Sequence, residues 1–330
     1  MTCVFRFALI AIFVCAACLS VFGQIEDPIR VESSLVRMNV GVVDQRGRPI
    51  TNLDRSSFTI SEDGVRQQIL NFEPVQQPFS VVLLLDMSGS TLTFRQNIKL
   101  SAGRFVDALK PDDRVAVVEF YDKINLRNDF TTDHRIIYHS IEASNGRGKT
   151  QLYKALDFAL DKLSHEGTRR KAIIVLTDGV DSEAQNKDRD VLVSAADNQV
   201  ASILKPEQNP AMNEVLTRSD RQGVTIYPLA LPTGDPAKLA DPTPRQIAMF
   251  EAARARLQLV ADHTGGVLSK INKLEDMSTL YAQVAADLQT LYTIEYQPSN
   301  DKRDGKWRTI RIETADPQLV SRTRTGYFAR

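Results

Sequence analysis

The feature that most constrains the fold is a pair of short apolar runs that both end in aspartate. Residues 81–85 read Val-Val-Leu-Leu-Leu before Asp86, and residues 173–177 read Ile-Ile-Val-Leu-Thr before Asp178. Such runs are typical of strands that are buried on both faces of a sheet. Since helical apolar stripes alternate with strand-like runs between residues 79 and 290, the sequence predicts right-handed crossovers and a mostly parallel, doubly wound α/β sheet.

The expected order of elements follows from these periodicities. Helical stripes are expected at 94–109, 152–163, 244–263 and 274–288. Strands are expected at 81–86, 115–120, 172–176, 224–231 and 266–271, with an edge strand at 124–130. The stretch 183–222 is long for a connection, and we interpret it as a helix with an insertion around 205–212.

Both flanks of this region are strand-like rather than helical. Residues 30–75 alternate and contain Glu62-Asp63-Gly64, a strong hairpin signal. On the other flank, strands are expected at 292–296, 306–313 and 319–328, with a hairpin at Asp304-Gly305 between the first two. Neither flank is long enough to close a sandwich alone. We therefore expect the α/β domain to be inserted in a smaller β-sandwich-like module made by both flanks. The predicted divisions are 1–23, 24–77, 78–290 and 291–330.

The first 23 residues are typical of a secretory signal peptide. An almost unbroken apolar run from Phe7 to Phe22 follows Arg6, and it is shorter than the roughly 20 residues that span a bilayer. We expect export to the periplasm or the extracellular space, and no other contact with a membrane. A membrane anchor formed by residues 7–22 and lipidation at Cys18 are the alternatives. All three cysteines lie in this segment, so a cleaved chain would have no disulfide or zinc–thiolate site.

The charge balance argues against a polyanionic partner. The chain has 41 Lys and Arg against 41 Asp and Glu, whereas a nucleic-acid binder usually carries a basic excess. Gly148-Lys149-Thr150 imitates the end of a phosphate-binding loop. The pattern also needs a glycine at position 143, which is Ala, and a preceding strand where a helix-like stretch is found. We expect neither nucleic-acid nor nucleotide binding.

A set of oxygen ligands is expected at the carboxyl edge of the sheet. Asp86 opens the sequence Asp86-Met-Ser88-Gly-Ser90, Thr150 starts a later helix, and Asp178 follows the second buried strand. Ligands of open α/β sheets bind beyond the carboxyl ends of the strands, so the two aspartates should meet there. Carboxylates and hydroxyls suit Mg²⁺, with Mn²⁺ or Ca²⁺ as alternatives. This shell is incomplete for an octahedral ion and leaves room for a carboxylate from a partner protein.

These five residues resemble the metal-ion-dependent adhesion site of a von Willebrand factor type A domain. The resemblance covers roughly residues 78–290, and the β flanks are similar to those of secreted bacterial proteins that carry this domain. It implies that Ser88 and Ser90 coordinate the cation directly and that Asp86 acts through water. Thr150 and Asp178 would alternate between direct and water-mediated roles. It also implies binding of a protein ligand through Asp or Glu, without catalysis. The long 183–222 segment departs from the family pattern and is expected near the metal edge.

Simpler alternatives exist for the role of each residue and for the function of the protein. Ser90, Thr91 or Thr150 could cap a helix, and Asp178-Gly179 could be only a turn. An envelope scaffold or assembly protein with a purely structural metal is the main alternative function. A phosphotransferase similar to the haloacid dehalogenases is a further one, but those enzymes have Asp-x-Asp where this chain has Asp86-x-Ser88. A serine hydroxyl cannot replace that second carboxyl as an acid or base.

Overall fold

The computed structural model describes residues 35–75, 77–196, 199–234, 240–271, 273 and 276–329. The predicted signal peptide and the alternatives at residues 7–22 and Cys18 lie outside these ranges. None of the helices within them combines the length and apolar character that a bilayer crossing requires.

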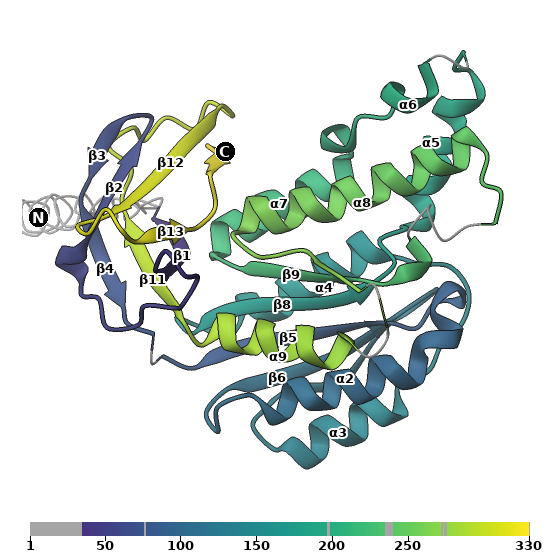
Figure 1. The fold of residues 1–330 in the computed structure, drawn as a ribbon, viewed down its shortest axis with the longest axis horizontal. Coiled ribbons are helices and arrows are strands. Elements are labelled where there is room, and N and C mark those ends of the chain that lie inside the picture. The colour runs from purple at the N-terminus through teal and green to yellow at the C-terminus, as the bar shows by residue number, and fades with distance from the viewer. Residues whose placement is uncertain are drawn as a thin grey trace, which may run out of the picture. The chain divides into compact units, whose positions relative to one another are not determined.

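A six-stranded sheet forms the centre of the fold, in the order β10-β9-β8-β5-β6-β7 (Figure 1). All neighbouring strands are parallel except β6 and β7, so the predicted edge strand is confirmed. The bounds are β5 Phe79–Asp86, β6 Arg114–Phe120, β7 Ile124–Thr131, β8 Arg170–Thr177, β9 Thr225–Ala230 and β10 Ser269–Lys270. Both apolar runs of the sequence are therefore adjacent central strands, because β5 pairs directly with β8.

Helices cover both faces of this sheet (Figure 1). Leu83 and Leu85 of β5 pack into the core under α2 Arg95–Asp107, α3 His134–Ala143 and α9 Met277–Leu288. Val82 and Leu84 point the other way, into the core under α4 Leu152–Ser164, α7 Pro210–Gln222 and α8 Pro244–Thr264. Successive residues of one strand thus fill opposite cores, which explains why the run is apolar without alternation.

Two four-stranded antiparallel sheets pack on a core of their own. One has the order β13-β1-β11-β4, and the other has the order β14-β12-β2-β3. The bounds are β1 Val36–Val43, β2 Phe58–Glu62, β3 Val65–Gln67, β4 Ile69–Glu73, β11 Leu291–Tyr296, β12 Trp307–Thr314, β13 Val320–Arg322 and β14 Gly326–Phe328. Each sheet mixes strands from both flanks. The predicted fold class, a mostly parallel α/β sheet with an additional antiparallel part, is confirmed; the exact domain boundaries stay a prediction.

Local turn signals were right in one flank and wrong in the other. Asp63 and Gly64 have φ of 49° and 81° and join β2 to β3, so the first predicted hairpin is confirmed. The hairpin at Asp304-Gly305 is wrong, because β11 pairs with β1 and β4 while β12 pairs with β2 and β14. The chain crosses between the two sheets there. The single strand expected at 319–328 is also wrong, since β13 and β14 belong to different sheets.

The long segment after β8 contains two full helices rather than one. Helix α5 Ser182–Val193 is followed by the short α6 Val200–Ile203 and the 3-10 turn η4 Pro206–Gln208. Helix α7 then begins at Pro210, where Pro is tolerated because the first helical N–H has no partner within the helix. The predicted insertion at 205–212 therefore overlaps the start of a helix and is corrected to a connection ending at Asn209.

Candidate metal centre

Asp86 is the last residue of β5 and is fully buried. Its Oδ1 accepts a hydrogen bond from the Ser88 backbone N–H at 3.0 Å, and its Oδ2 accepts one from the Thr177 hydroxyl at 2.7 Å. The Thr91 hydroxyl donates to the Asp86 carbonyl at 2.8 Å. The carboxylate is thus fixed from two sides, and the chain turns sharply into the 3-10 turn η2 Gly89–Phe94.

The two serines of this loop lie together at its surface end. Ser88 is buried and Ser90 is exposed, and their hydroxyl oxygens are 3.1 Å apart. Ser88 occupies the N-cap position of η2, but its side chain makes no capping hydrogen bond. The sequence also allowed Ser90 or Thr91 to serve only as a helix cap. In the structure Ser88 holds the N-cap position, and the Thr91 hydroxyl donates back to the carbonyls of Asp86 and Ser88.

Asp178 follows β8 directly and is 3% exposed. Its Oδ1 accepts the Val180 backbone N–H at 3.0 Å, which forms the local turn before α5. A hydrogen bond from Ser90 lowers the pKa of Asp178, but burial outweighs it and raises that pKa overall. The loop after β5 and the loop after β8 therefore meet through Ser90 and Asp178.

Thr150 lies on a third loop at the same edge and is 6% exposed. Its backbone N–H donates to the Ser182 hydroxyl and its carbonyl accepts the Ser182 N–H, both at 2.9 Å. The Gly89 N–H donates to the Gly148 carbonyl at 3.0 Å. These bonds tie the Thr150 loop to both other loops. Helix α4 has Gln151 rather than Thr150 at its N-cap, so Thr150 is not used as the cap.

The electrostatics of this edge suit a cation. Burial, and then the negative charge of Asp178, raise the pKa of Asp86 to about 7. Neither carboxylate forms an ion pair with a described residue. The positive charge of Arg254 lowers the pKa of Asp178, and Asp86 interacts favourably with Arg95. Burying two adjacent carboxylates remains costly, and a divalent cation would reduce that cost. Within the described ranges no group of three or more His, Cys, Asp and Glu side chains is arranged for a metal, and the hydroxyls of Thr177 and Ser90 donate to the two carboxylates.

Three residues that position the site carry no role in the sequence-based interpretation. Thr177 holds Asp86, and Ser182 clasps Thr150. Arg95 donates to the Met87 carbonyl at 2.9 Å, to the Gly146 carbonyl and to the Asn145 side chain, so it joins the first loop to the Thr150 loop. Thr177 stands beside a motif residue, which is a usable signal. Nothing in the sequence singles out Ser182 or Arg95.

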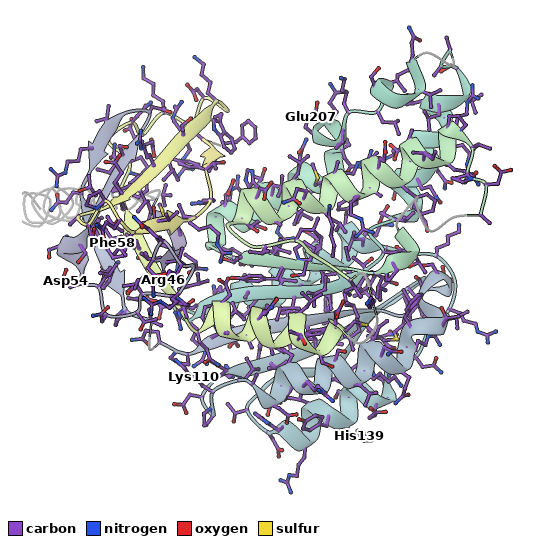
Figure 2. All side chains as sticks on the ribbon, in the orientation of Figure 1. Arg46, Asp54, Phe58, Lys110, His139 and Glu207 are labelled. Atoms are coloured by element: carbon purple, nitrogen blue, oxygen red, sulfur yellow. The ribbon has the colours of Figure 1, made fainter. Side chains whose placement is uncertain are left out.

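The histidines lie elsewhere in the fold. His139 is exposed on α3, at the outer side of the helical layer in Figure 2. His165 is exposed after α4, and His263 pairs with Asp220 at 2.9 Å. No hydrogen bond or ion pair joins a described histidine to the five candidate residues.

Residues 81–180 match the family described as the von Willebrand factor type A domain. That range contains the three loops and all five candidate residues. No curated protein matches the chain in sequence.

Several solved structures are similar to part or most of this chain at low sequence identity. The von Willebrand factor domain of the type V pili tip protein Mfa5 from Porphyromonas gingivalis is 16% identical; the match covers 64% of this chain and 94% of that chain, with a TM-score of 0.46. A von Willebrand factor type A protein from Catenulispora acidiphila is 11% identical. The match covers 89% of this chain and 75% of that chain, with a TM-score of 0.47. The pilus adhesin SpaC from Lactobacillus rhamnosus GG is 10% identical. The match covers 89% of this chain and 47% of that chain, with a TM-score of 0.48.

The family match and the mostly parallel sheet that carries the matched residues agree with each other. Residues 81–180 of this chain are similar to the von Willebrand factor type A domain.

Proposed function

We propose that the protein is an exported module that binds a protein ligand in a manner dependent on a divalent cation. An Asp or Glu of the ligand would complete the coordination. The observation that carries the proposal is the buried pair Asp86 and Asp178, which share one sheet edge with serine and threonine hydroxyls and form no ion pair with a described residue. The family match at residues 81–180 supports a protein-binding role.

The residues that would hold the cation are Ser88, Ser90 and Thr150, with Asp86 and Asp178 behind them. The cation, Mg²⁺ or alternatively Mn²⁺ or Ca²⁺, would supply two positive charges and a free position toward solvent. Asp86, Ser88 and Asp178 are buried, whereas Ser90 is exposed. Access to the site is therefore from the side of Ser90, where a ligand carboxylate would arrive.

We propose that this site binds and does not catalyse. Ser88 occupies the position where a metal-dependent phosphotransferase would need an acid or base, and its hydroxyl cannot serve as one near neutral pH. Each candidate residue already has a positioning or ligating use in the binding account, as the bonds of Asp86 to Ser88 and Thr177 illustrate.

The test is selection from a random peptide mixture on the immobilised protein in Mg²⁺, followed by elution with EDTA and sequencing. We expect enrichment of Asp and Glu in the eluted peptides, and no enrichment with a Ser90→Ala variant. Retention that survives EDTA, or eluted peptides without acidic enrichment, would contradict the proposal. Mg²⁺-dependent stability without such enrichment would favour the scaffold alternative.

A further inference from the structure

A polar cleft of about 540 Å³ opens directly beside Thr150. The starts of α4, α5 and α7 converge on it and contribute residues such as Gln151, Ser182 and Asn209. Thr150 lines the cleft and is also one of the candidate metal-holding residues. The cleft and the proposed metal site therefore share a wall, and a ligand bound at one lies next to the other.

Most charges in the cleft are already paired. Glu183 lies 3.2 Å from Lys187 and 3.8 Å from Lys154. Asp181 is nearly buried and accepts the backbone N–H groups of Glu183 and Ala184, so it caps α5. Asp157 pairs with Arg218 of α7. Because these groups already interact with each other or with the backbone, we do not expect them to be the main contacts of a charged ligand.

Three charged groups of the cleft form no ion pair with a described residue: Asp181, which is used as the cap of α5, and Lys149 and Glu214, which lie on different elements. Lys149 is exposed, lines the cleft and precedes Thr150, while Glu214 belongs to the second turn of α7. The wall nearest the metal loop is thus cationic, and the α7 wall carries the opposing carboxylate. A bound anion is favoured at the Lys149 end.

The Tyr153 hydroxyl is a second unused donor. Tyr153 lines the cleft, its side chain is about 95% buried, and its hydroxyl makes no hydrogen bond to a described residue. Burial raises the pKa of Tyr153 further above its usual range, so the hydroxyl stays protonated. Its charged neighbours are Arg256, Asp181 and Asp188. Asp188 holds Arg256 in two hydrogen bonds of 2.7 Å, and Asp181 accepts the N–H groups at the start of α5.

We propose that the cleft is a second carboxylate subsite, so that the preferred ligand segment carries two acidic residues. One would complete the metal site, and the other would lie in the cleft against Lys149 with the Tyr153 hydroxyl as a further donor. This inference rests on the proposed function, because the first carboxylate is placed by the metal site. The inference goes beyond the proposed function because it specifies a second acidic residue of the ligand, near the one that completes the metal site.

The test uses three capped tripeptides that differ only in carboxylates: acetyl-Glu-Gly-Glu-amide, acetyl-Gln-Gly-Glu-amide and acetyl-Glu-Gly-Gln-amide. Each is titrated into the protein in Mg²⁺ at low ionic strength, where an exposed ion pair is least screened. We expect the diacid to bind about fivefold more tightly than either monoacid, the size typical of one added exposed ion pair. Lys149→Gln should abolish this preference while the Kd values for Mg²⁺ and for the monoacids stay unchanged.

Lys110→Gln is the matched control. Lys110 precedes β6 and lies at the end of the sheet away from the carboxyl edge, as its label in Figure 2 shows. The Lys110→Gln substitution removes the same charge as Lys149→Gln, but the variant should keep the full preference for the diacid. Tyr153→Phe should reduce the preference by about threefold without affecting the monoacids.

Equal binding of monoacids and diacid, or a preference that survives Lys149→Gln, would overturn this inference and leave the proposed function standing. Failure of all three peptides to bind in Mg²⁺ would overturn both.

Discussion

At the residue scale, the position of the Asp86 carboxylate depends on Thr177. The Thr177 hydroxyl donates to Asp86 Oδ2 at 2.7 Å and accepts the Gly179 N–H at 3.1 Å. One buried side chain therefore fixes both the carboxylate of β5 and the turn that presents Asp178. Groups that orient a metal ligand in this way commonly affect metal affinity almost as strongly as the ligands themselves.

Replacing Thr177 by Val tests this role, because Val keeps the shape and removes the hydroxyl. Leaving a buried carboxylate oxygen and a buried N–H without partners should lower the free energy of unfolding by about 1–3 kcal/mol. We also expect Mg²⁺ affinity to fall by about tenfold. Urea unfolding and calorimetric titration measure the two effects. Thr293→Val is the control, since Thr293 is equally buried and bonds Asn39 in the sandwich; it should lower stability and leave Mg²⁺ affinity unchanged.

Asp178 is expected to be unfavourable for stability when no cation is present. Burial raises the pKa of Asp178, and its charge in turn raises the pKa of Asp86. Asp178→Asn should therefore stabilise the protein in EDTA, because the amide carries no buried charge, and it should abolish stabilisation by Mg²⁺.

Thermal unfolding in EDTA and in Mg²⁺ measures this change. Asp188→Asn is the opposite case, because Asp188 pairs with buried Arg256, and its loss should destabilise the protein by about 3–5 kcal/mol in both buffers. Asp178→Asn destabilising the protein in EDTA would contradict the account of the site.

At the element scale, the site is made by three loops whose conformations depend on one another. Gly148 has φ of +102°, and a Cβ placed on it would lie 2.0 Å from a carboxylate oxygen of Asp122. That carboxylate accepts the Lys149 N–H at 2.7 Å. The loop that carries Thr150 therefore needs a residue without a side chain at 148, both for its backbone angle and for Asp122.

Gly148→Ala should weaken Mg²⁺ binding, because the backbone strain and the displaced Asp122 both shift the Thr150 loop. We expect stability to fall by about 1–3 kcal/mol. Gly305→Ala is matched in having φ of +72°, but no atom lies within 4 Å of the added Cβ. It should cost stability without changing the Mg²⁺ titration. Unchanged Mg²⁺ affinity in Gly148→Ala would show that the Thr150 loop is not part of the site.

The elements that could be predicted from sequence are those defined by local periodicity. The buried runs ending at Asp86 and Asp178 and the edge strand at 124–130 follow from the side-chain pattern alone. The pairing of β11 with β1 joins residues about 250 positions apart, which no local signal encodes. A turn such as Asp304-Gly305 shows that the chain bends but not which strands it connects. Contacts across loops, such as that of Arg95 with Gly146, are beyond the sequence for the same reason.

At the scale of the whole molecule, side chains join the sandwich to the α/β part. Buried Arg324, between β13 and β14, donates to Asp220 of α7 at 2.7 Å and to the Arg37 carbonyl of β1 at 3.0 Å. Asn39 of β1 donates to the Thr225 hydroxyl of β9 at 2.9 Å. These buried bonds hold the first and last parts of the described chain against the same α/β elements.

Arg324→Met should lower the free energy of unfolding by about 3–5 kcal/mol, because it leaves the buried Asp220 carboxylate without this partner. Mg²⁺ affinity should stay unchanged, since Arg324 lies on the sandwich side. Arg311→Met is the control; Arg311 is 75% exposed and pairs with Glu313 of its own strand, so its loss should cost less than about 1 kcal/mol. Urea unfolding of both variants gives the comparison, and equal costs would contradict the role of Arg324 as a buried link.

The central claim is that one divalent cation binds where Asp86, Ser88, Ser90, Thr150 and Asp178 converge. Calorimetric titration of Mg²⁺ and Mn²⁺ into the protein, beside Asp86→Ala, tests it most directly. We expect saturable binding at one site in the wild-type protein and none in the folded variant. Absence of binding to the folded wild-type protein, or binding that Asp86→Ala leaves intact, would contradict the claim.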